Sequence, residues 1–179
     1  MTSTTTDRDW TSKQRVMAAF SLERPDRVPF VELAIDPPIA EHFLSHGGYR
    51  PPWDPESIDS RLVVRTMPCD APHDPSALAD ALNLDAIGVS MWIRHGGIEE
   101  AAGERTMIRG GGIGSLADVA GITLPDPTDP VLYEPCRGFV ERYADSDKAL
   151  FGVVNLCSDP VILGMGFERF AMALYDDRA

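Results

Sequence analysis

The sequence predicts an α/β fold built on a mostly parallel sheet with covering helices. Segments with helical spacing alternate with short apolar segments of strand type along the 179 residues. Their order is helix, strand, helix, strand, hairpin, helix, strand, helix. Only three principal strands are found, which is too few to close such a sheet. The chain is therefore expected to be part of a larger fold.

A polar tail and a capped helix are expected at the start of the chain. Residues 1–10 are polar and read as a loose, disordered tail. A helix is predicted over residues 11–22, where Thr11 and Gln14 have the spacing of a capping box. Pro25 ends this helix, because a proline interrupts helical hydrogen bonding.

The next segment, "RVPFVELAI" over residues 27–35, is predicted to be the first strand. Side chains alternate between the two faces of a strand. Glu32 and Asp36 therefore share one face, opposite the aliphatic face of Val31, Leu33 and Ile35.

The middle of the chain is expected to supply a helix and a second strand. After a proline-rich stretch, residues 57–67 are compatible with either a helix or a strand. A clearer helix follows over residues 74–84, with Asp74 as N-cap and Pro75 at the first helical position. It leads directly into an apolar strand over residues 84–92.

The remaining segments are predicted from glycines, prolines and hydrophobic spacing. Residues 98–114 have the alternation and glycines of a hairpin, and residues 123–130 form a turn-rich connector. A helix over 131–143 is followed by a third strong strand over 149–157. A final helix is expected over residues 159–177.

Composition restricts the function classes. The formal net charge of -12 argues against nucleic-acid binding, which needs clustered Lys and Arg. The three cysteines are widely spaced and contain no CxxC pair, which fits reduced thiols in a cytoplasmic protein. No secretory leader and no membrane-spanning stretch is expected.

Strand ends supply the candidate binding residues, because ligands of parallel α/β folds bind at the carboxyl ends of strands. Glu32 and Asp36 lie at the first such end, with Asp36 nearest the opening. A carboxylate buried there without a partner is costly, so its presence indicates a site. The alternative is a solvated Asp36 that caps the turn at Pro37 and Pro38.

The other two strand ends add further candidates for substrate binding. Ser90 and Trp92 share a face with small residues of the second strand, which suits the floor of a ligand site or plain packing. At the third strand end, Asn155 can hydrogen-bond a substrate oxygen. Cys157 is more typical of an inert buried thiol.

In "SKQRVMAAFSLERPDRVPF", an arginine and a short helix precede a Pro-Asp-Arg-x-Pro segment. This stretch resembles the opening of the uroporphyrinogen decarboxylase superfamily. "LNLDAIGVS", "GSLADVAGITLPDPTDP" and "GMGFERFAMALYDD" follow in the family's order. The resemblance spans nearly the whole chain from Thr11.

This resemblance implies the fold. The family's fold is a (β/α)₈ TIM barrel of roughly twice this length. Residues 11–179 would then form about the N-terminal half of the barrel. Half a barrel leaves sheet edges open and apolar faces uncovered, so self-association or a missing C-terminal half is expected.

The family divides into two chemistries, and the decarboxylases are the first. They bind the tetrapyrrole uroporphyrinogen without a cofactor, using arginines after the first strand and an aspartate after the second. This chain instead has "LAIDPPIAE" and "SMWI" at those places. Asp85 matches an earlier, structural aspartate of the family's second strand.

The second branch comprises methyltransferases that move methyl groups to or from a corrinoid protein. They use a zinc-bound thiol and lack the arginine motif. Their zinc ligands lie in the second half of the barrel, so this chain is expected to hold no metal and no identified catalytic residue.

The resemblance therefore implies a relative of the corrinoid (cobalamin)-dependent methyltransferases or O-demethylases, inactive as this half alone. Zinc and a corrinoid are implied for the full-length protein, and a corrinoid protein is a possible partner. Glu32, Asp36, Trp92 and Asn155 would line the barrel mouth. The alternatives are a uroporphyrinogen decarboxylase, a carboxy-lyase of porphyrin biosynthesis, and a non-catalytic truncated homologue.

Overall fold

The computed structural model describes residues 9–44, 47–59, 61–93, 96–102, 105–154 and 158–176. Contacts between residues divide the chain into two compact units. The sheet unit comprises Met1–Ser57, Val64–Ser90 and Tyr133–Val153. The hairpin unit comprises Ile58–Val63, Met91–Leu132 and Val154–Ala179.

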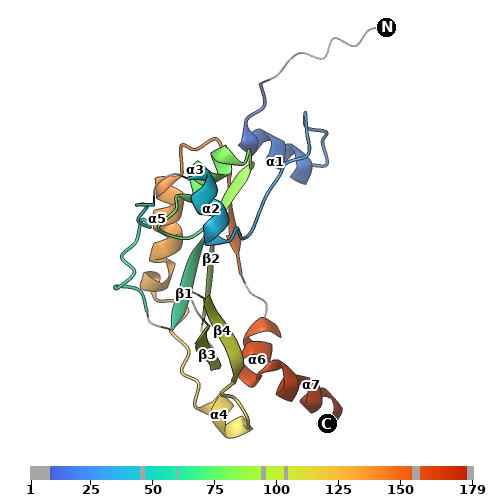
Figure 1. Cartoon of the computed structure of the whole chain (residues 1–179), viewed down its shortest axis with the longest axis vertical. Coiled ribbons are helices and arrows are strands. Elements are labelled where there is room, and N and C mark those ends of the chain that lie inside the picture. The colour runs from blue at the N-terminus through green and yellow to red at the C-terminus, as the bar shows by residue number, and fades with distance from the viewer. Residues whose placement is uncertain are drawn as a thin grey trace. The chain divides into compact units, whose positions relative to one another are not determined.

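Helices and strands alternate along much of the described chain (Figure 1). The helices are α1 (Ser12–Phe20), α2 (Pro37–Phe43), α3 (Pro75–Ala81), α4 (Leu116–Ala120), the 3-10 helix η1 (Pro130–Tyr133), α5 (Glu134–Arg142), α6 (Ser158–Met165) and α7 (Phe167–Asp176). The strands are β1 (Leu62–Met67), β2 (Ala86–Ile93), β3 (Gly97–Ala102), β4 (Arg105–Gly111) and β5 (Ala149–Val153).

The start of α1 is the predicted capping box. The Thr11 hydroxyl accepts a hydrogen bond from the Gln14 N–H at 3.2 Å, and the Gln14 side chain accepts one from the Thr11 N–H at 3.1 Å. The Lys13 N–H donates to the Asp147 carbonyl at 2.7 Å, which ties α1 to the residues before β5. The first helix is thus held in place at its N-terminus.

The strand predicted over residues 27–35 is wrong, because this segment forms no strand. Pro29 has no N–H to give to a ladder. The other backbone groups bond singly and to different places: the Phe30 N–H donates to the Asp85 carboxylate, and the Ile35 N–H donates to the Pro68 carbonyl. Alternating hydrophobicity was present, but no neighbouring strand pairs with it.

Helix α2 was not predicted from the sequence. Pro37 and Pro38 were read as a turn, whereas they occupy the first turn of a helix, where a missing N–H costs nothing. The helix buries Ala40 against Leu78 of α3 and against Cys69. Two prolines in succession therefore start an element here.

The predicted helix after Asp74 is present as α3, and the ambiguous segment before it is strand β1. The Asp74 carboxylate accepts hydrogen bonds from the Ser76 N–H at 2.8 Å and the Ala77 N–H at 3.4 Å. These bonds satisfy two of the free donors at the helix start.

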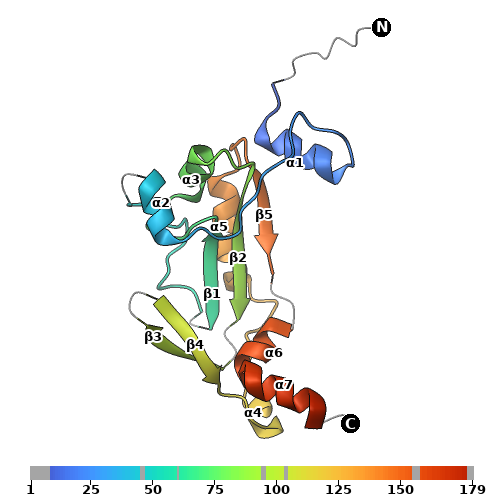
Figure 2. The same cartoon turned by 45° about the vertical axis from the view of Figure 1, so that its right-hand side comes forward.

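The three-stranded sheet has the order β1-β2-β5 (Figure 2). Strands β2 and β5 are parallel, and their register runs from Ala86 opposite Ala149 to Ser90 opposite Val153. In the residues that the structure describes, β5 pairs with β2 alone, which leaves its other edge without a strand.

One face of this sheet carries the core of the sheet unit. Ile87 and Val89 of β2 pack against Phe139 of α5, against Tyr143 directly after that helix and against Ala79 of α3. Ile87 and Ala79 are fully buried and Phe139 is 1% exposed. At about 25 cal/mol per Å² of apolar surface, burial of such side chains is the main stabilising term.

The hairpin unit contains the predicted hairpin, with β3 antiparallel to β4 and a register shift at Ile98 and Glu99. Arg169 of α7 donates hydrogen bonds to the Ile113 carbonyl at 2.9 Å and to the Gly111 carbonyl at 3.4 Å. Helix α4, which was not predicted, has Ser115 as its N-cap, and the Ser115 hydroxyl accepts a hydrogen bond from the Asp118 N–H.

The single final helix predicted over residues 159–177 is wrong, because two helices occupy this range. Gly166 separates α6 from α7 with a φ of +78°, a conformation that side chains rarely tolerate. Glycine at this position therefore ends α6 and lets the chain change direction.

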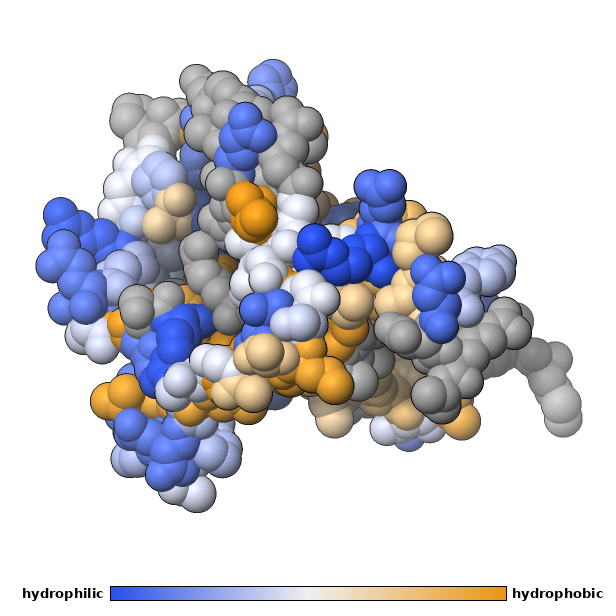
Figure 3. All heavy atoms as spheres, turned by 90° about the horizontal axis from the view of Figure 1, so that it is seen from below, coloured by the Kyte–Doolittle hydropathy of each residue, from blue (hydrophilic) through white to orange (hydrophobic). Residues whose placement is uncertain are grey.

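None of the described helices has the length and apolar character that a membrane crossing requires. Many large apolar side chains are nevertheless exposed, including Leu22 at 96% and Leu116 at 88%. Figure 3 shows apolar residues, in orange, open on the viewed face among charged ones.

Candidate functional site

Two stretches of the sequence meet in an ion-paired cluster, here called the Asp85 cluster. Asp85 lies just before β2 and is fully buried. Its carboxylate accepts hydrogen bonds from the Phe30 N–H at 2.8 Å, from Arg27 Nη2 at 2.8 Å and from Arg15 Nη1 at 3.4 Å. Asp26 completes the cluster by accepting two bonds from Arg15, at 2.7 and 2.9 Å.

The hydrogen bonds and ion pairs of the cluster offset the free-energy cost of burying the Asp85 carboxylate. Burial alone would raise the pKa of Asp85, but the Phe30 N–H and the Arg27 guanidinium together lower it below its ordinary value. Asp85 is therefore an ionised anchor that ties residues 26–30 to the start of β2. Its fully bonded oxygens give it a structural role.

The face of the sheet opposite the helices, here called the small-residue face, carries Ala86, Gly88, Ser90, Phe151 and Val153. Paired residues of parallel strands point the same way, and alternate residues point to opposite faces. Because Ile87 and Leu150 pack toward α5, these neighbours point away from it.

The small-residue face carries an aromatic ring, Phe151, and a buried hydroxyl, that of Ser90. A Cβ on Gly88 would lie 2.6 Å from the Phe151 ring, so the ring rests on the glycine. Ser90 is 2% exposed, and its hydroxyl meets no hydrogen-bond partner among the described residues. A buried hydroxyl without a partner is costly, so Ser90 is a polar group on this face whose hydrogen bond is not accounted for by the described residues.

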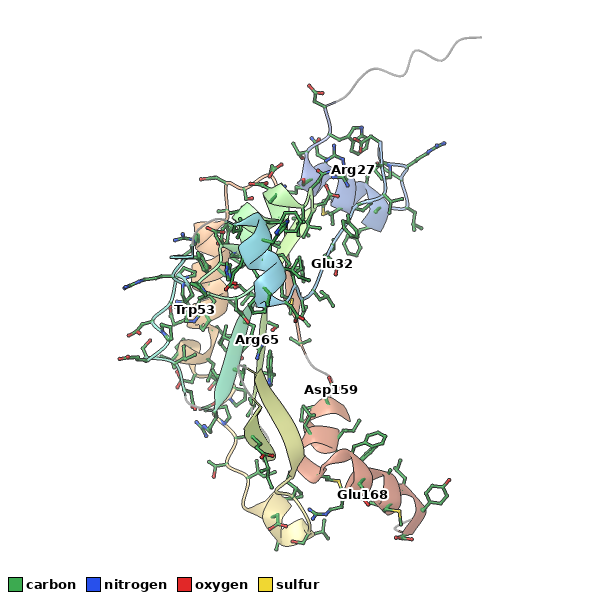
Figure 4. All side chains as sticks on the ribbon, viewed as in Figure 1. Arg27, Glu32, Trp53, Arg65, Asp159 and Glu168 are labelled. Carbon is green, nitrogen blue, oxygen red and sulfur yellow. The ribbon has the colours of Figure 1, made fainter. Side chains whose placement is uncertain are left out.

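The other predicted binding residues are spread along the chain. Glu32 is half-buried on the segment between α1 and α2 and has no hydrogen bond or ion pair in the described part of the chain (Figure 4). Asp36 is exposed at the N-cap position of α2, and its side chain makes no capping bond. Trp92 is half-buried and belongs to the hairpin unit. Asn155 and Cys157 lie outside the described residues.

The two described cysteines are poor nucleophiles. Cys69 is 5% exposed, and burial raises its pKa to about 12. Burial likewise raises the pKa of Cys136. Only the thiolate is reactive, so both thiols are inert at neutral pH.

Sequence reasoning missed a cavity of about 430 Å³ in the sheet unit. Its polar lining consists of Tyr49, Arg50, Asp74 and Arg142. Asp74 was predicted only as a helix cap, and no motif links it to the two arginines. No sequence pattern marks this cavity, because its residues come from a loop, a helix start and a helix end that lie far apart in the sequence.

No metal site is formed by the described residues, which contain no group of three His, Cys, Asp or Glu side chains suited to an ion. The zinc implied by the methyltransferase resemblance therefore finds no ligand set in this part of the chain.

No protein-family model matches the chain, and neither the curated proteins nor the solved structures contain a significant match.

Proposed function

We propose that this chain is the N-terminal half of a (β/α)₈ barrel of the uroporphyrinogen decarboxylase superfamily, on the corrinoid methyltransferase side of that family. The Asp85 cluster is the observation that supports the family most. Arg15, Asp26 and Arg27 come from the stretch that resembles the family's opening, and Asp85 comes from the "LNLDAIGVS" stretch. The residues that carry the resemblance thus form one ion-paired cluster in the structure.

The arrangement of the sheet also supports a partial barrel. In a barrel of this kind, helices cover the outer face of parallel strands, and the side chains of the inner face, largely branched ones, pack in layers. Strands β2 and β5 are parallel, α3 and α5 pack on one face, and the small-residue face lies opposite. The free edge of β5 is where a further strand of the barrel would pair.

The residues after the Asp85 cluster favour the methyltransferase side. Glu32 and Asp36 stand in the region where the decarboxylases carry arginines. Two carboxylates would repel a substrate that bears many carboxylates itself. In this proposal the unpartnered hydroxyl of Ser90 contacts the substrate or the corrinoid, and zinc is held by residues of the missing half.

The test uses the protein in its native form, expressed together with whatever the coding DNA carries downstream of Ala179. A continuing or frameshifted reading frame with His-x-Cys and a later Cys is expected there. The protein so produced is incubated with methylcobalamin and a thiol acceptor, and the cobalamin absorbance is followed. We expect loss of the methylcobalamin spectrum with the long protein and none with the 179-residue chain.

Uroporphyrinogen serves as the competing substrate in the same experiment. Formation of coproporphyrinogen by the long protein would overturn the methyltransferase proposal.

Ser90→Ala is expected to slow methyl transfer by about tenfold, the effect of losing roughly one hydrogen bond of 1.4 kcal/mol. Ser57→Ala, which removes an exposed hydroxyl bonded to the Asp54 carbonyl, is the matched control and should leave the rate unchanged.

A further inference from the structure

We propose that the cavity between the Gly47–Arg50 segment, α3 and α5 binds a small organic anion, which presents a carboxylate or phosphate group to Arg50 and Arg142. The cavity lies wholly within the sheet unit. This inference stands apart from the proposed function, because none of these residues belongs to the small-residue face or to the Asp85 cluster.

Neither arginine of the cavity has a carboxylate partner within the described part of the chain. The protein carries a net charge of -12, and its other arginines in the described ranges commonly pair with acids. Such pairs hold Arg15, Arg27, Arg61, Arg65 and Arg137. Arg50 has no hydrogen bond or ion pair within the described part of the chain, and Arg142 forms no ion pair there.

Arg142 is positioned by aromatic rings. Its guanidinium carbon lies 5.3 Å from the centre of the Tyr49 ring and 5.8 Å from the centre of the Tyr143 ring. Stacking of this kind restrains the plane of the guanidinium while leaving its N–H edge open. An N–H fork held in this way suits the bidentate recognition of a carboxylate or phosphate.

The carboxylate in the cavity lining does not neutralise these arginines. Asp74 accepts hydrogen bonds from the Ser76 N–H, the Ala77 N–H and, at 3.1 Å, the Tyr143 hydroxyl. Its negative charge is therefore engaged by donors of its own helix and by a tyrosine. The cavity keeps a positive balance in a strongly acidic protein.

Tyr49 adds an unused polar group to the residues that line the cavity. Its hydroxyl is buried and meets no partner at hydrogen-bond geometry among the described residues, although the Tyr143 hydroxyl, which donates to Asp74, lies near it. Burial raises the pKa of Tyr49, so it stays protonated and able to donate at neutral pH.

Size limits the ligand. A volume of about 430 Å³ lies within the range of pockets that hold small metabolites. Two guanidiniums suit one or two anionic groups on such a molecule. A small dicarboxylate and a small phosphate ester share this chemistry.

The test is isothermal titration calorimetry on the full 179-residue chain, with inorganic phosphate and succinate as separate probes at physiological salt. We expect saturable binding of at least one probe with one site per chain. Preference for phosphate or for succinate then identifies the anionic group. Arg142→Gln and Arg50→Gln should each weaken binding by about tenfold or more, the loss of roughly one charge-assisted hydrogen bond.

Arg137→Gln is the matched control, because Arg137 also lies on α5 and is exposed, but pairs with Glu134 at 2.6 Å. The Arg137→Gln variant should bind phosphate or succinate with the same affinity as the unmodified chain. Arg142→Lys keeps the charge without the fork and should weaken binding less than Arg142→Gln, with the circular dichroism spectrum unchanged in both. Absence of binding for both probes at millimolar concentration, or an equal loss in Arg137→Gln, would overturn the proposal.

Discussion

The sheet unit and the hairpin unit are stabilised in different ways. In the sheet unit, Leu78, Leu84 and Ile87 are fully buried and an ionised aspartate is buried with its partners. In the hairpin unit, helices α4 and α7 bury none of their described residues, and Phe167 and Tyr175 of α7 are each 74% exposed.

This difference indicates which part of the molecule can fold from its own contacts. Side-chain burial supplies most of the free energy of folding. The sheet unit has a core of its own. In the hairpin unit, β4 and α6 meet through backbone atoms at Gly111 and Gly164, and many of the described apolar side chains of α6 and α7 are exposed. We infer that the hairpin unit depends on a further covering partner, as a half-barrel would.

The largest expected effect is in the Asp85 cluster. Asp85→Ala leaves the Arg27 and Arg15 guanidiniums and the Phe30 N–H without their buried acceptor. We expect a loss of about 3–5 kcal/mol in the free energy of unfolding, the usual cost of breaking a buried ion pair from one side. Urea denaturation followed by circular dichroism measures it.

The control for that experiment lies in the hairpin unit. Asp59 pairs with Arg61 at the surface, with side chains 20% and 39% exposed. Asp59→Asn should cost only a small fraction of the Asp85→Ala loss, because exposed pairs contribute little. Equal losses would contradict the contrast between the two units.

A smaller effect is expected at the glycine under Phe151. In Gly88→Ala the new methyl group would lie 2.6 Å from the ring, so the ring must move. Overpacking of this kind costs about 1–3 kcal/mol. Gly152→Ala is the control on the neighbouring strand, where an added Cβ meets nothing within 4 Å. Identical unfolding midpoints for the two variants would show that Phe151 does not rest on Gly88.

The corresponding pair in the hairpin unit tests its backbone contacts. A Cβ on Gly111 would overlap the backbone of Gly164, Met165 and Gly166, whereas a Cβ on Gly110 meets nothing within 4 Å. Gly111→Ala should raise the hydrogen-exchange rates of α6 and β4 amides by about tenfold or more, and Gly110→Ala should not. Equally faster exchange in residues 86–90 of β2, which belong to the sheet unit, would contradict the separate stabilisation of the two units.

The smallest effect is on pH dependence. The pKa of Asp85 lies below its usual value of 3.8 in the folded chain, so the unfolded chain binds more protons as pH falls. The stabilisation is present above pH 3.8 and is lost on further acidification through the folded pKa. The stability of Asp85→Asn should fall less steeply with acid than that of the unmodified chain. Parallel slopes would contradict the lowered pKa.

Local signals in the sequence predicted several elements well. The capping box at Thr11 and Gln14 and the Asp74-Pro75 helix start depend on neighbours within a few residues, and both are present. Strand pairing depends on distant residues. Residues 27–35 had the alternation of a strand, yet Pro29 and the Asp85 carboxylate draw their backbone into single bonds.

Of the candidate site, too, the sequence predicted the features that depend on local pattern and missed those that depend on distant residues. The alternation of side chains in β2 was sufficient to predict that Ser90 shares a face with small residues, and β5 supplies the parallel partner. The lack of a hydrogen-bond partner for its hydroxyl required coordinates. The arginine cavity also required them, because a loop and the end of α5 supply Arg50 and Arg142.

The half-barrel proposal is tested most directly by light scattering of the purified 179-residue chain after size exclusion, with binding of a fluorescent apolar dye measured on the same sample. An open edge on β5 and exposed apolar residues predict self-association together with strong dye binding. A cooperatively unfolding monomer that binds no dye would contradict the proposal.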